Sequence, residues 1–173
     1  NENGFGPSPR AIAAIEAASG GQWMYGDPEN FDLKQALAAK LGVSPANIIV
    51  GEGIDGLLGN LVRLYVGAGD AVVTSLGAYP TFNYHVAGFG GVLHTVPYKD
   101  DHEDIAALMA KAHEVNAKIV YLANPDNPMG SWHRGADIVA ALDDLPEGSL
   151  LLLDEAYVEC APAGTAAPVD VTD

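Results

Sequence analysis

The chain has 173 residues, of which 49% are hydrophobic and 18% charged, and 23 acidic against 8 cationic side chains give a formal net charge of -15. A chain of this length and apolar content can bury a substantial core and is not expected to be disordered. The few cationic side chains form no basic cluster, so we expect no nucleic-acid partner. No apolar run approaches the roughly 18 residues that a membrane span needs, and we expect no membrane partner.

The single cysteine, Cys160, excludes an intramolecular disulfide and a zinc site made of several cysteines. We expect Cys160 to be a small buried hydrophobic residue. The five histidines lack the spacing of metal ligands, are expected on the surface or on helices, and indicate no metal site. The segment Asn1-Glu2-Asn3-Gly4 shows no signal-peptide pattern, so the expected location is the cytoplasm.

Two helices are predicted in the first part of the chain, over residues 7–19 and 31–41, with Asn30 as the N-cap of the second. Further on, short apolar strands alternate with helices. Strands are expected at 48–50, 71–75, 92–96, 118–123 and 150–154, and helices at 55–66, 79–87, 102–116 and 135–145.

The strands carry apolar residues at successive positions, as strands buried on both faces do. The fold class is therefore α/β, a mainly parallel sheet with helices on both faces. We divide the chain into an N-terminal segment with its helices, residues 1–45, and the first part of a larger domain, residues 46–173.

A glycine-rich loop, Gly51-x-Gly53-x-x-Gly56, follows the first predicted strand and opens a helix. Glycines there let backbone N–H groups approach a phosphate at the positive end of the helix. A dinucleotide site also needs an acidic residue at the end of the next strand, where Thr74-Ser75-Leu76-Gly77 has none. A phosphate-binding loop is favoured, and a tight turn that serves packing alone stays open.

Polar side chains follow two of the later strands. Asp154 comes directly after Leu150 to Leu153, at the edge of the sheet where open α/β folds bind ligands. Such a carboxylate is suited to pair with a cationic ring nitrogen, although an exposed acid without a function is the alternative. The loop Asn124-Pro125-Asp126-Asn127-Pro128-Met129-Gly130 follows the preceding strand, and its Asn–Pro steps hold an amide in a fixed direction. Tyr157 supplies a phenol near Asp154.

In this order along the chain, the motifs resemble those of fold-type-I aminotransferases that use pyridoxal 5'-phosphate (PLP), most closely those that act on histidinol phosphate. The resemblance covers nearly all 173 residues. The motifs that carry it are residues 1–9 (Asn-Glu-Asn-Gly-Phe-Gly-Pro-Ser-Pro), Tyr25-Gly26-Asp27, the loop from Gly51 to Asp55, Tyr79, the segment 124–130, and Asp154-Glu155-Ala156-Tyr157.

The resemblance implies a role for each of these motifs. The backbone of Gly53, Ile54 and Asp55 would hold the PLP phosphate, and Tyr79 would stack on the ring. Asp154 would pair with the ring nitrogen and keep it protonated, so that the ring acts as an electron sink. Asn127 and Tyr157 would bond the ring oxygen O3', and Tyr25 would reach the cofactor of a neighbouring subunit, which implies a homodimer.

Three residues depart from the family pattern: Gly56 stands where Glu is usual, Asp126 where Asn is usual and Met129 where Thr is usual. The family's catalytic lysine lies well after the Asp-Glu-Ala-Tyr motif, and none of the five lysines here matches its position. We therefore expect the sequence to be the N-terminal portion of an enzyme, cut before the lysine that forms the Schiff base.

The predicted reaction transfers an amino group from histidinol phosphate or an amino acid to a 2-oxo acid such as 2-oxoglutarate. The alternative is a non-catalytic module that binds a phosphate or the cofactor and has lost the lysine. A phosphate-binding module would retain the glycine loop without the chemistry.

Overall fold

The structure is a computed structural model that describes residues 4–168, as two compact units that comprise residues 1–48 and 49–173. The Asn1-Glu2-Asn3 start of the first family motif lies outside the described residues, as does the end of the chain, residues 169–173. Because the placement of one unit relative to the other is not determined, each unit is described by itself.

The first unit contains α1 (Pro9–Ala18), the 3₁₀ turn η1 (Ser19–Gly21), α2 (Phe31–Leu41) and the 3₁₀ turn η2 (Pro45–Asn47). Ala38 is the one buried side chain among the described residues of this unit. Its large apolar side chains are exposed, and Trp23, for example, is 83% exposed. The unit therefore has helices but very little core of its own.

Asn30 is the N-cap residue of α2, as the sequence predicted, but its backbone is left-handed, with φ of 50°, and its side chain makes no capping bond. The side chain of Asp27 bonds backbone N–H groups just before and at the start of the helix instead. Its carboxylate accepts hydrogen bonds from the backbone N–H of Phe31 at 2.7 Å and of Glu29 at 3.0 Å. These two bonds lower the pKa of Asp27 from its ordinary value. An Asx-type turn thus precedes the helix.

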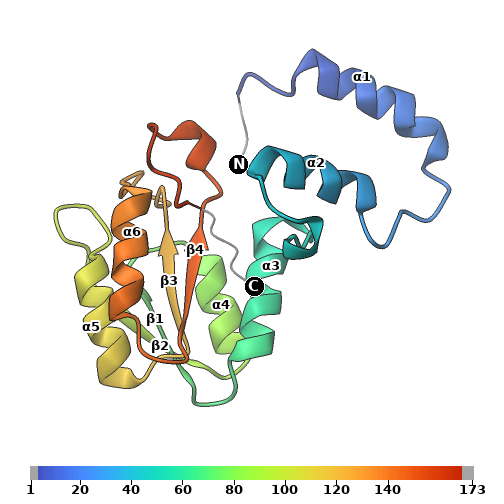
Figure 1. Cartoon of the computed structure of the whole chain (residues 1–173). Helices are drawn as coiled ribbons and strands as arrows, with labels where there is room; N and C mark the ends of the chain where they lie inside the picture. The colour runs from blue at the N-terminus through green and yellow to red at the C-terminus, as the bar shows by residue number, and fades with distance from the viewer. Residues whose placement is uncertain (1–3, 169–173) are drawn as a thin grey trace. The chain divides into compact units, whose positions relative to one another are not determined.

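The second unit is a parallel sheet with helices on both faces (Figure 1), and it confirms the predicted fold class. The strands are β1 (Ala71–Ser75), β2 (Val92–Val96), β3 (Ile119–Ala123) and β4 (Leu150–Asp154), in the spatial order β2-β1-β3-β4, with parallel pairing throughout. The helices are α3 (Gly53–Tyr65), α4 (Pro80–Gly88), α5 (Ile105–Val115) and α6 (Gly135–Ala141), and the 3₁₀ turns are η3 (Leu142–Asp144) and η4 (Val158–Cys160).

The core lies in two layers, one on each face of the sheet. Helices α3 and α4 cover one face, where the ring of Phe82 stacks on Tyr121 of β3 with centroids 4.5 Å apart. Helices α5 and α6 cover the other face, with Leu108 and Ile138 almost fully buried. Figure 1 shows these two helix pairs on opposite sides of the strands. Every residue of β3 is buried, as the run of apolar residues predicted.

The predicted strand over residues 48–50 is wrong. Ile48 has extended backbone, but among residues 4–168 no strand pairs with this segment, and Ile49 is 79% exposed. A strand depends on a partner that may be far away in sequence, whereas the apolar run of three residues reports only local character.

The chain passes from β1 to β2 on one side of β1 and returns to β3 on its other side. Such a reversal of strand order is the place where open α/β sheets bind ligands, outside the carboxyl ends of the strands. The β1–β3 ladder pairs Val72 with Ile119 and Val73 with Val120, whereas the β3–β4 ladder runs from Ile119 to Ala123. No helix within residues 4–168 is long and apolar enough to cross a membrane.

Candidate functional site

Asp154 ends β4 and is 6% exposed, so the exposed alternative for this acid is wrong. The hydroxyl of Tyr121 donates a hydrogen bond of 2.8 Å to its Oδ2, and the backbone N–H of Ala156 donates one of 3.0 Å to its Oδ1. Burial and the nearby Asp154 charge raise the pKa of Tyr121, which keeps the phenol a donor. The carboxylate is therefore held in one orientation by a neighbouring strand and by its own loop.

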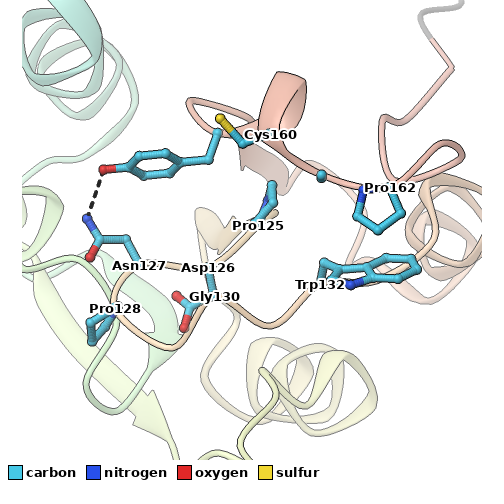
Figure 2. Close-up of a pocket in the computed structure, with 10 residues that line it drawn as sticks. Pro125, Asp126, Asn127, Pro128, Gly130, Trp132, Cys160 and Pro162 are labelled. Carbon is cyan, nitrogen blue, oxygen red and sulfur yellow. Dashed lines mark hydrogen bonds between the residues drawn. The ribbon is translucent and has the colours of Figure 1, made fainter. Parts of the chain in front are cut away.

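Asn127 lies in the loop after β3, and its side-chain amide donates to the Tyr157 hydroxyl at 3.4 Å (Figure 2). The loop is fixed at its base by Asn124, which is fully buried. Its side chain accepts a hydrogen bond from the His133 backbone N–H at 2.8 Å and donates to the carbonyls of His133 and Thr165. Asn127 and Tyr157, two predicted site residues that follow different strands, are therefore in contact.

An open cavity of about 470 Å³ lies between these two strand-end loops. Asn127 stands on one side of it, and Trp132 and Pro162 stand on the other (Figure 2), while Tyr157, the hydrogen-bond partner of Asn127, also lines it. The other lining residues are Pro125, Asp126, Pro128, Gly130, Cys160 and Ala161. A cavity with mostly apolar walls and a few polar groups is typical of small-molecule sites.

The predicted burial of Cys160 is wrong, because its side chain is exposed. Cys160 ends the 3₁₀ turn η4, beyond β4 and outside both core layers, and it lines the cavity. The expectation of burial rested on the residue type alone, since cysteine is usually buried. This cysteine, however, lies in the segment that follows a strand end.

The glycine-rich loop forms the start of α3. Gly53 has a φ of 70°, a left-handed conformation that side-chain-bearing residues rarely adopt, and a Cβ placed there would meet nothing within 4 Å. The N-cap residue Glu52 makes no side-chain cap. The carboxylate of Asp55, in the first turn, is 2.8 Å from Nε2 of His85 on α4. A Cβ at Gly56, by contrast, would come within 2.8 Å of a carboxylate oxygen of Glu52, so the open backbone of this loop lies at Gly53.

Tyr79 and Tyr25 complete the predicted set. Tyr79 is the N-cap residue of α4, four residues after β1 ends, and so lies at the same edge of the sheet as the other strand-end loops. Tyr25 belongs to the first unit and is fully exposed. Among the described residues no hydrogen bond joins Tyr79, Gly53 or Ile54 to Asp154.

Two further acids lie at the carboxyl edge, and no role was predicted for either from the sequence. Glu103 is 1% exposed and bonds Ser75 and Ala123, and burial together with the charges of Asp126 and Asp154 raises its pKa to about 7. Asp126 accepts a hydrogen bond of 2.9 Å from the hydroxyl of Tyr98, and burial raises the pKa of Asp126. Each of the three acids at this edge therefore has one hydroxyl partner.

The sequence contains a feature that could have indicated the role of Tyr121, but it contains none that indicates the burial of Glu103. Tyr121 stands in an apolar strand, and a buried tyrosine hydroxyl needs a hydrogen-bond partner. Glu103 reads as an acid in the first turn of a helix predicted over 102–116, but the helix starts at Ile105 and Asp104 caps it. Among residues 4–168 no group of three acids, histidines or cysteines could hold a metal ion.

Residues 1–172 match the sequence model of the family described as aminotransferase class I and II. Among curated relatives, histidinol-phosphate aminotransferase of Anaeromyxobacter sp. (strain Fw109-5) is 41% identical over 94% of this chain and 45% of its own length. The enzyme of the same name from Moorella thermoacetica is 37% identical over 94% of this chain and 42% of its own length. The chain thus spans less than half the length of these relatives.

A solved structure agrees with the sequence comparison. The crystal structure of histidinol-phosphate aminotransferase from Sinorhizobium meliloti in complex with pyridoxal-5'-phosphate superposes with a TM-score of 0.95 at 63% identity. The match covers 97% of this chain and 46% of that chain. The fold at the carboxyl edge of the sheet is therefore shared with a structure that contains the cofactor.

Proposed function

The chain belongs to the class I and II aminotransferase family, and from this premise we propose that it forms the N-terminal part of the large domain of a PLP-dependent aminotransferase. The observation that carries the proposal is the pair of strand ends that hold Asp154 and Asn127. Asp154 is buried and oriented by Tyr121, and Asn127 contacts Tyr157 at the wall of a cavity. A histidinol-phosphate aminotransferase that is 63% identical to the chain crystallised in complex with pyridoxal-5'-phosphate.

The residues fit the ring of PLP. A buried, fixed carboxylate such as Asp154 pairs well with a protonated pyridine nitrogen, because the low dielectric strengthens the ion pair. The side-chain amide of Asn127 and the hydroxyl of Tyr157 lie 3.4 Å apart and can both donate to one oxygen, as the ring oxygen O3' requires. Tyr79, at the start of α4, would cover the ring with its own aromatic face.

The start of α3 fits a phosphate. Gly53 is left-handed and carries no side chain, and the space that a Cβ would occupy there is open, which leaves room for an anion to approach the backbone at the start of the helix. The partial positive charge of a helix N-terminus favours an anion. The nearby carboxylate of Asp55 would oppose the anion, and its contact with His85 offsets that charge when the histidine is protonated.

When bound, PLP supplies an electron sink that stabilises negative charge at the α-carbon of an amino substrate. The chain's own residues bind and orient the group. Asp154 would hold a proton on the ring nitrogen, Asn127 and Tyr157 would fix the ring oxygen, and the α3 backbone would anchor the phosphate. We propose that the covalent lysine lies outside these 173 residues.

We propose histidinol phosphate as the amino donor and a 2-oxo acid such as 2-oxoglutarate as the acceptor. The support is that the relatives at 41% and 37% identity are histidinol-phosphate aminotransferases. Aromatic amino acids are the second choice of donor. A cytoplasmic homodimer is proposed with it, in which the exposed Tyr25 of one subunit reaches the cofactor of the other.

The test is an activity assay on the protein at its natural length. PLP is added and its visible absorption is followed, and glutamate formation is then measured from 2-oxoglutarate with histidinol phosphate, with tyrosine and with phenylalanine as donors. We expect a shifted absorption band that borohydride removes, and the highest kcat/KM with histidinol phosphate. A higher kcat/KM with an aromatic amino acid contradicts the proposed donor.

The same assay separates the enzyme from the non-catalytic alternative. A protein that binds PLP noncovalently and forms no glutamate with any donor is a binding module that has lost the chemistry. A protein that binds no PLP at all contradicts the proposed enzyme and a cofactor-binding module alike, and leaves only a module that binds phosphate alone. The unshifted spectrum of free PLP serves as the reference for each case.

A further inference from the structure

Glu103 lies between β2 and α5 and does not line the cavity, yet its carboxylate is one of the most buried polar groups among residues 4–168. Its Oε2 accepts a hydrogen bond of 2.5 Å from the hydroxyl of Ser75, the last residue of β1. Its Oε1 accepts one of 2.9 Å from the backbone N–H of Ala123, the last residue of β3. One carboxylate therefore joins the ends of two neighbouring strands.

The ladder between these strands leaves room for this bridge. Strands β1 and β3 pair at Val72–Ile119 and Val73–Val120, and no further pair is formed toward their carboxyl ends. A buried backbone N–H without a partner is costly, and Ala123 would be such a group without Glu103. The carboxylate thus replaces a missing ladder bond at the place where the strand order reverses.

The backbone of Glu103 is tied to the loop that carries Asn127. Nε2 of the His133 ring is 2.8 Å from the Glu103 carbonyl oxygen, and since a carbonyl only accepts, the ring nitrogen donates. His133 in turn bonds Asn124, at the base of the loop, through its backbone. Side chain and main chain of one residue therefore fix both ends of the segment from Ala123 to His133.

We propose that Glu103 is a positioning residue for the transamination site: it holds the ends of β1 and β3 together and so sets where Tyr79 and Asn127 stand. It does not contact the cofactor. The inference rests on the proposed function, because Tyr79 and Asn127 follow these strand ends as the ring's proposed contacts. Misplacement of such contacts by about 1 Å can reduce a rate by about 100-fold.

The test compares Glu103→Ala and Glu103→Gln in the protein at its natural length, with Glu147→Ala as a control at an exposed glutamate. Alanine removes both bonds. Glutamine keeps an acceptor for the Ala123 N–H and offers a donor to the Ser75 oxygen. We expect Glu103→Ala to lower kcat by about 10- to 100-fold with KM for the 2-oxo acid little changed, and to change the visible circular dichroism of bound PLP. Glu103→Gln should restore both kcat and the circular dichroism.

Three results overturn the inference. The first is a folded Glu103→Ala that keeps the wild-type kcat and circular dichroism. The second is a rise in the KM of Glu103→Ala with no change in kcat. The third is a Glu103→Gln that restores neither kcat nor the circular dichroism. If Glu103→Ala does not fold, Ser75→Ala decides, since it removes one bond: a kcat at least about threefold lower with unchanged KM supports the role, and an unchanged kcat overturns it. A wild-type protein that binds no PLP overturns the proposed function as well, which the variants alone cannot do.

Discussion

The start of α3 and the carboxyl ends of β3 and β4 lie at the same sheet edge, but different parts of the chain fix their geometry. At α3 the surface is backbone, with a left-handed Gly53 and a contact between half-exposed side chains, His85 and Asp55. At the strand ends the polar side chains are buried, and Asp154 is bound from a neighbouring strand by Tyr121. Apart from Gly53 itself, a site formed by backbone depends little on which side chains surround it, whereas a buried side-chain network depends on each member.

The comparison predicts the largest effect at Asp154. Asp154→Asn keeps the shape but removes the charge that would hold a proton on the cofactor ring, so we expect kcat to fall by about 10²- to 10⁴-fold with a smaller change in KM. Steady-state kinetics and the absorption spectrum of bound PLP measure this. As a control, Tyr121→Phe removes one hydrogen bond to the same carboxylate and keeps the ring that stacks on Phe82, so it should cost much less. Equal losses in both variants would contradict the assignment of the charge.

The second effect is a pH dependence of stability that originates at Glu103. Its pKa is raised from 4.5 to about 7, first by burial and then by the charges of Asp126 and Asp154, against the bonds from Ser75 and Ala123. Between these values the folded protein binds more protons than the unfolded chain. The contribution to the free energy of unfolding is thus fully present below pH 4.5 and is lost as pH rises to 7, by about 3 kcal/mol.

Denaturant unfolding between pH 4.5 and 8 measures this slope. Glu103→Gln should remove most of it, and a smaller slope should persist because burial also raises the pKa of Asp126. Glu147→Gln changes an exposed acid and should leave the slope as it is. A wild-type protein that becomes more stable as the pH rises from 5 to 7, with no difference from Glu103→Gln, would remove Glu103 from this account.

The third prediction distinguishes a loss of stability caused by backbone strain from a loss of affinity for PLP at the start of α3. In Gly53→Ala the new methyl group enters open space, so the cost is that of a left-handed alanine, about 1–2 kcal/mol. Gly69 is also left-handed with open surroundings, but it lies in the loop before β1, at the opposite edge of the sheet. Gly69→Ala should therefore lose the same stability and keep its affinity for PLP, whereas Gly53→Ala should bind PLP more weakly. Titration of both variants with PLP checks this, and equal affinities would argue against a phosphate at α3.

The sequence predicted what depends on local pattern. Leu150 to Leu153 reads as a strand, and β4 forms there with Asp154 at its end, although Leu152 is the one leucine of the four that is buried. It failed where distant residues decide: Glu103 is buried because of Ser75 and Ala123, which are 28 and 20 residues away along the chain. The motif residues were found through family resemblance, whereas their hydroxyl partners need the three-dimensional pairing of strands.

The smallest effect is expected at the contact between His85 and Asp55. The Asp55 side chain is 59% exposed, so solvent and salt screen the pair, and His85→Ala should cost less than about 1 kcal/mol in the free energy of unfolding. The loss should shrink in high salt. Lys111→Ala breaks a comparably exposed pair with Glu114 on α5 and is the matched control. If His85→Ala instead lowered the free energy of unfolding by several times as much as Lys111→Ala, the start of α3 would depend on its side chains after all. The contrast with the strand ends would then fail, because both regions would be built in the same way.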